Sequence, residues 1–269
     1  KYGVDFVFTF FGPAYVNFRS THFLGFGDGW VTHPNRFAYG TVVGFKNRAF
    51  LTLNNFYKRH WIKFADYWIV EADIAKKGIL NITKCPKDSV FVVNNGCRDI
   101  FRSIQCAHLS GDGSDIVKLL YLSSYYSHKN FPFVVDVADR LKKEFPEIKI
   151  RFVLSLDRES DTVAHLIRKV EALAVEQYFE FVGMVSLRDV PELYQKCHFA
   201  FIPTLLETFT AAYPEAMACG MPVITTDMDF ARSICDAAAA YFSPNDINGA
   251  TTLIARLITD PMYREELAV

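Results

Sequence analysis

The sequence contains no long apolar run and no excess of positive charge. None of its apolar stretches approaches the roughly 20 residues that a helix needs to span a bilayer, so no transmembrane helix is predicted. The net charge of -1 provides no overall field that would gather nucleic acid, although local basic patches remain open. We therefore expect a soluble protein without a nucleic-acid partner.

Paired cysteines are also missing. The six cysteines form no C-x-x-C pair and have no histidine at metal-binding spacing, which argues against a zinc site and against a disulfide framework. Such a chain is typical of the cytoplasm, where thiols stay reduced. Free and mostly buried thiols are expected at Cys85, Cys97, Cys106, Cys197, Cys219 and Cys235.

The sequence is instead rich in apolar residues arranged in an alternating pattern. Short runs of β-branched and aromatic residues alternate with stretches of helical period, which is typical of parallel sheets with crossover helices. The predicted fold class is α/β. In residues 1–108, helices are predicted at 50–64 and 74–80, with strands at 4–10, 22–26, 67–70 and 90–93. The first of these strands is expected to be buried.

A polar stretch at 103–114 is predicted to separate two lobes, and residues 115–269 form the second. Ligands in open parallel sheets bind outside the carboxyl ends of the strands, so the loops after Leu122, Val182, Pro203 and Thr225 are expected to carry the site. Helices are predicted at 131–144, 162–174, 190–196, 210–219, 247–259 and from 261 onward. Strands are predicted at 118–122, 149–154, 179–182, 199–203, 222–225 and 240–242.

Two glutamates in residues 199–227 of the second lobe suggest a site that binds hydroxyl groups. Glu207 and Glu215 are eight positions apart, a little over two helical turns, so both can lie on one side of a helix that begins near Thr208. Ionised carboxylates only accept hydrogen bonds, which suits sugar and ribose hydroxyls. The first N–H groups of that helix, at Phe209 and Thr210, would suit a diphosphate. Alternatively, Glu207 caps the helix and Glu215 is a solvated surface residue.

This segment resembles a known family. Glu207 to Glu215, followed by Ala-Met-Ala-Cys-Gly-Met-Pro-Val-Ile, is similar to the E-x7-E motif and the EAMA-x-G-x-PV stretch of retaining glycosyltransferases of family 4. The resemblance reaches from Phe181 to Asp260, nearly the whole second lobe. It implies a GT-B architecture, in which two Rossmann-like lobes with mostly parallel sheets hold the acceptor (first lobe) and the donor (second lobe). The family's first Gly-rich loop and its last helix are not found, so an incomplete N-terminal lobe is expected.

A second match assigns further residues by resemblance. The stretch from Leu122 to Phe131 looks like the family's phosphate-facing loop, with Lys129 at the position of the diphosphate-binding lysine. Ser124 stands where the family has an arginine, and Asn130 where it has a glycine. The resemblance gives the donor sugar to Glu207, the ribose to Glu215 and the phosphates to the backbone of Phe209 and Thr210. It also places Gly183 and Met184 near the base, and Asp28 where a histidine often faces the sugar.

The implied reaction is the transfer of a hexose from a nucleoside diphosphate sugar to a saccharide or lipid-linked saccharide acceptor, with retention. No cofactor and no obligatory metal are expected. The resemblance further suggests synthesis of a bacterial surface polysaccharide or glycoconjugate, in the cytoplasm or peripherally at the inner face of the membrane. Two alternatives stay open: a degenerate binding protein, because Ser124, Asn130 and Asp28 depart from the pattern, or another GT-B enzyme such as a sugar-nucleotide epimerase.

Overall fold

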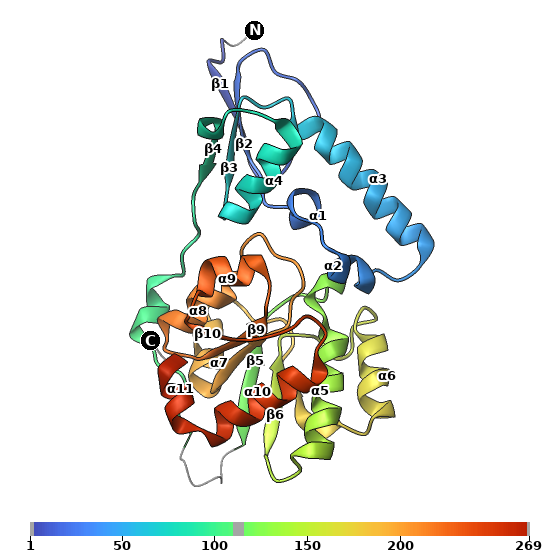
Figure 1. The fold of residues 1–269 in the computed structure, drawn as a ribbon, viewed down its shortest axis with the longest axis vertical. Helices are drawn as coiled ribbons and strands as arrows, with labels where there is room; N and C mark the ends of the chain where they lie inside the picture. Colours follow the sequence, from blue (N-terminus) through green and yellow to red (C-terminus); the bar gives the residue numbers. More distant parts are fainter. Residues whose placement is uncertain (1–2, 110–115, 268–269) are drawn as a thin grey trace. The chain divides into compact units, whose positions relative to one another are not determined.

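The computed structural model describes residues 3–109 and 116–267. Its contacts group residues 1–96 with 206–210 in a first unit, and residues 97–205 with 211–269 in a second (Figure 1). Both units combine helices with a parallel sheet, which confirms the predicted α/β class. Residues 110–115 lie outside the described residues, so the lobe boundary at 103–114 stays a prediction.

The first unit contains a four-stranded parallel sheet in the order β1-β2-β3-β4. Its strands are β1 (Phe6–Thr9), β2 (Thr21–Gly25), β3 (Tyr67–Val70) and β4 (Val90–Val92). Its helices are α1 (Gly29–Thr32), α2 (Arg36–Thr41), α3 (Phe45–Ile62) and α4 (Asp73–Thr83), with a short 3-10 turn η1 (Lys87–Ser89).

The core of the first unit gathers around Trp68 of β3. This side chain is buried with Leu24 and Ile79, and its indole N–H donates to the carbonyl oxygen of Ile62 at 3.0 Å. The prediction that the first strand is buried is wrong: Phe6 and Phe8 of β1 are exposed. The strand lies at the edge of the sheet and pairs with β2 alone among the described strands.

The second unit contains a six-stranded parallel sheet in the order β10-β9-β8-β5-β6-β7. Its strands are β5 (Val117–Tyr121), β6 (Ile150–Leu154), β7 (Phe179–Phe181), β8 (Phe199–Ile202), β9 (Val223–Thr226) and β10 (Ala239–Phe242). Its helices are α5 (Phe131–Glu144), α6 (Ala164–Ala172), α7 (Val190–Lys196), α8 (Ala212–Ala218), α9 (Asp229–Cys235), α10 (Ile247–Thr259) and α11 (Pro261–Leu267). The 3-10 turns are η2 (Asp99–Ser103), η3 (Ser127–Lys129) and η4 (Glu176–Tyr178).

This strand order creates a topological switch point between β5 and β8. The chain runs from β5 outward through β6 and β7, then returns to the other side of β5 at β8. The rings of Phe152, Phe201 and Phe242 pack together in the core. The ring centroids of Phe152 and Phe201 are 5.4 Å apart, and those of Phe201 and Phe242 are 5.7 Å apart. Since all these strands are parallel, the loops after β5 and β8 leave the sheet at the same edge, where ligands bind in such folds.

Several details differ from the sequence prediction. Helix α8 begins at Ala212, so Phe209 and Thr210 precede it instead of forming its first turn. Pro214, which has no N–H, lies in that turn and removes one donor. The short helices α1, α2 and α9 were not predicted, because each spans at most 7 residues and shows little periodicity.

Candidate functional site

The loop after β5 holds Lys129 in a defined backbone position. The buried Tyr121 hydroxyl donates to the carbonyl oxygen of Lys129 at 2.7 Å. The next residue, Asn130, is buried, takes the left-handed conformation with φ 58° and donates to Asn245 Oδ1 at 3.1 Å. Asparagine tolerates this conformation better than most residues, which explains how it stands at the family's glycine position. The backbone is therefore fixed by a hydrogen bond at residue 129 and by another at residue 130, and Lys129 itself is half-buried.

Hydrogen bonds tie this loop to the segment that follows β8. The backbone N–H of Leu205 donates to the carbonyl oxygen of His128 at 2.8 Å, and the Thr204 hydroxyl donates to the same oxygen at 3.3 Å. Thr204 and Leu205 are fully buried. These hydrogen bonds join the two loops that flank the switch point, and Lys129, the residue after His128, lies with them beyond the carboxyl end of β5.

Glu215 lies in α8 and is half-buried, which speaks against the alternative interpretation of it as a solvated surface residue. Its Oε2 accepts a hydrogen bond from the hydroxyl of the buried Tyr194 at 3.1 Å. Burial raises the pKa of the Glu215 carboxyl above its ordinary value, and the hydrogen bond from Tyr194 and the positive charge of Arg98 partly oppose this rise. This carboxylate can accept hydroxyl donors from a ligand.

Arg98 belongs to the surroundings of Glu215 and was missed by sequence reasoning. Its guanidinium donates to the carbonyl oxygen of Leu187 at 2.6 Å and lies 5.3 Å from the ring centroid of Phe101. Phe101 in turn packs edge-on against Tyr194, the hydrogen-bond donor to Glu215. No local pattern could have revealed this, since Arg98 and Glu215 are more than a hundred positions apart.

We expect an Arg98→Gln variant to raise the pKa of Glu215 further, because the charge that favours the carboxylate is lost. Ligand hydroxyls donate to the ionised form, so binding that depends on Glu215 disappears as the pH falls through this raised pKa. The acid limb of the nucleotide binding that the family resemblance implies should therefore move to higher pH in the variant. Calorimetric titrations across a pH series measure this, and Arg140→Gln, which removes an exposed arginine on α5, is the matched control. Identical acid limbs in wild type and Arg98→Gln would contradict the assignment.

Contacts group the segment Leu206–Thr210 with the first unit. There, the ring nitrogen Nε2 of His33 donates to the carbonyl oxygen of Glu207 at 2.6 Å. The Thr208 hydroxyl lies 3.1 Å from Glu71 Oε2 and donates a hydrogen bond to it. Glu207 itself is half-buried. Sequence reasoning gave no role to His33, which does not match the family pattern cleanly, or to Glu71, which directly follows a predicted strand.

Asp28 is held by two contacts within the first unit. One carboxylate oxygen caps α1 by accepting from the N–H of Trp30 at 3.0 Å, and the other pairs with Lys58 Nζ at 2.6 Å. Asp28 also lines a cavity of about 280 Å³ with Phe11 and Tyr15 beyond the carboxyl ends of β1 and β2. The contact of Asp28 with a donor sugar stays a prediction.

The other residues named by sequence lie on loops of the second unit. Gly183 follows β7 with φ 71°, and its N–H donates to the carbonyl oxygen of Leu156 at 3.1 Å. Met184 is 93% exposed. Ser124 is exposed after β5, and its carbonyl oxygen accepts from the N–H of Tyr126 at 3.0 Å. A base near Gly183 and Met184 and a phosphate near Ser124 stay predictions.

No group of three or more His, Cys, Asp or Glu side chains in residues 3–109 and 116–267 could hold a metal ion. Asp227 and Asp229 do follow β9 directly, at a spacing that could suggest a metal site. However, Asp227 pairs with Arg232 through two contacts of 2.7 and 3.0 Å, which lowers the pKa of Asp227. The described helices also include none that is both long and apolar enough to cross a bilayer.

Comparison with known proteins connects these features to a family. The sequence matches the family described as glycosyl transferases group 1 over residues 112–268. It is 24% identical over 205 residues to the O-antigen chain mannosyltransferase B of Escherichia coli, covering 72% of this chain and 52% of that protein. It is 23% identical over 146 residues to the phosphatidylinositol N-acetylglucosaminyltransferase gpi3 subunit of Schizosaccharomyces pombe, covering 54% and 31%. The chain thus spans about half the length of the first of these relatives, and less of the second.

Solved structures show the same fold. Anabaena HepE, crystallised with UDP-glucose, superposes with a TM-score of 0.67 at 16% identity, over 93% of this chain and 66% of that one. The sucrose-phosphate synthase of Thermosynechococcus elongatus gives a TM-score of 0.69 at 17% identity, over 93% and 62%. At this level of identity the likeness establishes the fold, and that fold is GT-B.

Proposed function

Because this chain belongs to the glycosyl transferases group 1 family, we propose that it transfers a hexose from a nucleoside diphosphate sugar to a hydroxyl of a saccharide or lipid-linked saccharide acceptor. The observation that carries this proposal is the arrangement at the switch point of the second unit. The loop bearing Lys129 is hydrogen-bonded to the segment after β8, and the half-buried Glu215 follows in α8. A cation and a hydroxyl acceptor on consecutive parts of one sheet edge suit a diphosphate and a ribose.

In this proposal, each group has one task. The Glu215 carboxylate accepts hydrogen bonds from the ribose hydroxyls, and its Oε2 also accepts a hydrogen bond from the Tyr194 hydroxyl. The Lys129 ammonium faces the diphosphate and offsets the charge that grows as the nucleotide leaves. Gly183 and Met184 border the base, while Glu207 and the backbone of Phe209 and Thr210 face the donor sugar and the phosphates. The reaction proceeds with retention and without an obligatory metal.

The proposed setting is the synthesis of a bacterial surface polysaccharide, in the cytoplasm or peripherally on the inner face of the membrane. The similarity to an Escherichia coli O-antigen mannosyltransferase supports it and makes mannose the first sugar to test. The exposed Ser124 at the family's arginine position favours a second candidate, a binding protein that has lost turnover. Nucleotide binding without transfer or hydrolysis would identify this second candidate.

Calorimetric titration with UDP, GDP, UDP-glucose and GDP-mannose tests the proposal. We expect one nucleotide to bind in the micromolar range, about -8 kcal/mol. A Glu215→Gln variant keeps the size of the side chain but loses its charge, so binding should weaken at least about tenfold. The control Glu192→Gln removes an exposed glutamate of α7 that pairs with Lys196. Wild-type protein that is folded yet binds none of the four ligands would contradict the proposal.

A further inference from the structure

The segment that carries Glu207 is anchored in the first unit. The contacts of Leu206–Thr210 lie there, although the chain on either side of this segment is grouped with the second unit. His33 Nε2 donates to the carbonyl oxygen of Glu207 at 2.6 Å, and the hydroxyl of Thr208 donates to Glu71 Oε2 at 3.1 Å. The segment is therefore bound at residue 207 through its backbone and at residue 208 through its side chain.

The ring of His33, the first anchor, is itself held in one orientation. His33 follows α1, and its backbone N–H donates to the carbonyl oxygen of Gly29 at 3.0 Å. Its Nδ1 lies 2.8 Å from the hydroxyl oxygen of Thr32. A carbonyl oxygen can only accept a hydrogen bond, so the proton that reaches Glu207 is carried by Nε2. The contact at Nδ1 thus directs the other ring nitrogen toward Glu207.

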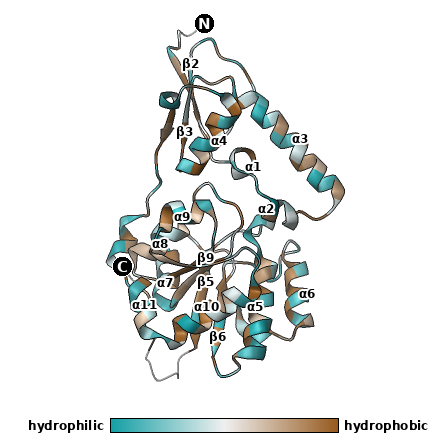
Figure 2. Ribbon diagram, viewed as in Figure 1, coloured by the Kyte–Doolittle hydropathy of each residue, from teal (hydrophilic) through white to brown (hydrophobic). Residues whose placement is uncertain are grey.

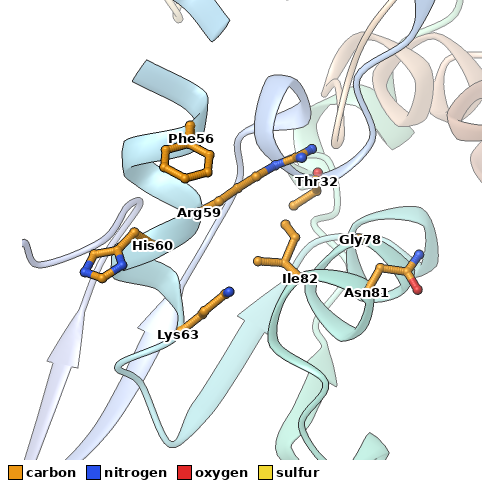
Figure 3. Close-up of a pocket in the computed structure, with 8 residues that line it drawn as sticks. All are labelled: Thr32, Phe56, Arg59, His60, Lys63, Gly78, Asn81 and Ile82. Atoms are coloured by element: carbon orange, nitrogen blue, oxygen red, sulfur yellow. The ribbon is translucent and has the colours of Figure 1, made fainter. Parts of the chain in front are cut away.

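Helix α1, which His33 terminates, is held by α3 and α4. Arg59 of α3 donates from Nε and Nη2 to the carbonyl oxygen of Val31 at 3.1 and 2.8 Å. Figure 2 shows hydrophilic and hydrophobic residues side by side along α3, and in Figure 3 Arg59 reaches toward Thr32 beside a cavity of about 480 Å³. A Cβ atom at Gly78 of α4 would lie 2.4 Å from the carbonyl oxygen of Thr32. His33 therefore extends from a helix that two neighbouring helices fix in place.

Glu71, the second anchor, also has a defined position. It directly follows β3, and its backbone carbonyl oxygen accepts from the side-chain amide of Asn94 at 3.0 Å. Its Oε1 accepts from the side-chain amide of Asn95 at 2.5 Å, and its Oε2 accepts from Thr208. A Cβ atom at Gly27 would approach this Oε2 to 3.2 Å. Both carboxylate oxygens are thus fixed before Thr208 binds to one of them.

Leu206 holds the chain on the other side of Glu207. Leu206 is buried, and a Cβ atom at Gly29 would lie 3.1 Å from Leu206 Cγ, so this side chain packs directly against α1. The backbone is therefore fixed both before and after Glu207, whose side chain is half-buried. A carboxylate meets the hydroxyls of a ligand in one geometry only when surrounding contacts lock its position.

We propose that His33 and Glu71 are positioning residues for Glu207. They act through the backbone of the segment, so that the Glu207 carboxylate faces the donor sugar. This inference rests on the proposed transferase function and on the role proposed there for Glu207. A misplacement of about 1 Å can cost roughly 100-fold in rate, so the loss of an anchor should slow the transfer. Binding of the nucleotide depends on Glu215 and Lys129 in this proposal and should change little.

Kinetics of His33 variants test the inference, with the donor that the titrations identify. His33→Ala should lower kcat about 100-fold, while the Kd of the free nucleoside diphosphate changes by less than about threefold. His33→Gln should recover most of the rate, because its amide nitrogen can take the place of Nε2 and donate to the same carbonyl oxygen. In a Glu207→Ala background, His33→Ala should cost at most about twofold more, because the side chain that it positions is absent.

The second anchor is tested at Thr208. Thr208→Val keeps the shape of the side chain but removes the hydroxyl that donates to Glu71, and should lower kcat about tenfold. Thr208→Ser keeps the hydroxyl and should keep most of the rate. The matched controls are His165→Ala in α6 and Thr252→Val in α10, which change exposed residues of the second unit and should leave kcat unchanged. Circular dichroism confirms the folding of each variant.

Four results would overturn the inference while the transferase function stands. His33→Ala turns over like wild type, His33→Gln is no faster than His33→Ala, or His33→Ala costs as much in the Glu207→Ala background as alone. The fourth is a loss of nucleotide affinity in His33→Ala as large as its loss of rate, which would indicate a structural role only. A folded wild-type protein that neither binds nor turns over any donor overturns the proposed function, and this inference with it.

Discussion

A Lys129→Met variant is expected to lower kcat about 100- to 1,000-fold, the usual cost of losing one group that stabilises charge in the transition state. With serine at position 124, Lys129 is the one cation that the family resemblance places on the donor diphosphate. Methionine fills a similar volume without the charge. The tie between Tyr121 and the backbone of residue 129 does not involve the side chain, so the loop should keep its conformation.

The measurement is the rate of nucleoside diphosphate release from the donor that the titrations identify, with and without acceptor. Lys143→Met removes an exposed lysine of α5 that pairs with Asp139 and should leave the rate unchanged. A Lys129→Arg variant should recover part of the loss, because it restores the charge at a slightly different position. If Lys129→Met turns over like wild type, the assignment of residue 129 to the diphosphate is wrong.

Gly78→Ala should lower the free energy of unfolding of the first unit by about 2 kcal/mol. A Cβ atom at position 78 of α4 would lie 2.4 Å from the carbonyl oxygen of Thr32 and 2.6 Å from its Cβ. Two of the three nearest atoms belong to the backbone at the end of α1, so no rotamer change relieves the clash. The helices must separate, even though alanine favours a helix over glycine by about 1 kcal/mol.

Tryptophan fluorescence measures this effect selectively. All three tryptophans, Trp30, Trp61 and Trp68, lie in the first unit, so a urea titration followed by fluorescence reports the unfolding of that unit. The control is Gly40→Ala in α2, where a Cβ meets nothing within 4 Å. We expect equal or slightly higher stability for this control. A Gly78→Ala variant as stable as Gly40→Ala would show that the contact between α1 and α4 is not tight.

Much of the fold was predictable because it rests on local periodicity. Helix α5 and strand β3 begin and end where the pattern of apolar residues predicts, and the βα steps of the second unit other than the one through α9 follow from it. The start of α8 was placed too early, since apolar and polar residues at 208–211 continue the helical period although the chain is not yet helical. Periodicity records which residues are apolar and does not report where the first turn closes.

The candidate site, too, was predictable from the sequence only in part. The spacing of the sequence singled out Glu207 and Glu215, and the family resemblance singled out Lys129, because these residues stand in segments that follow predicted strands. Their roles stay predictions. Tertiary structure alone decided that Tyr194 and Arg98 act on Glu215, and that His128 links the loops after β5 and β8. These contacts join residues far apart in the chain, and only folding brings such residues together.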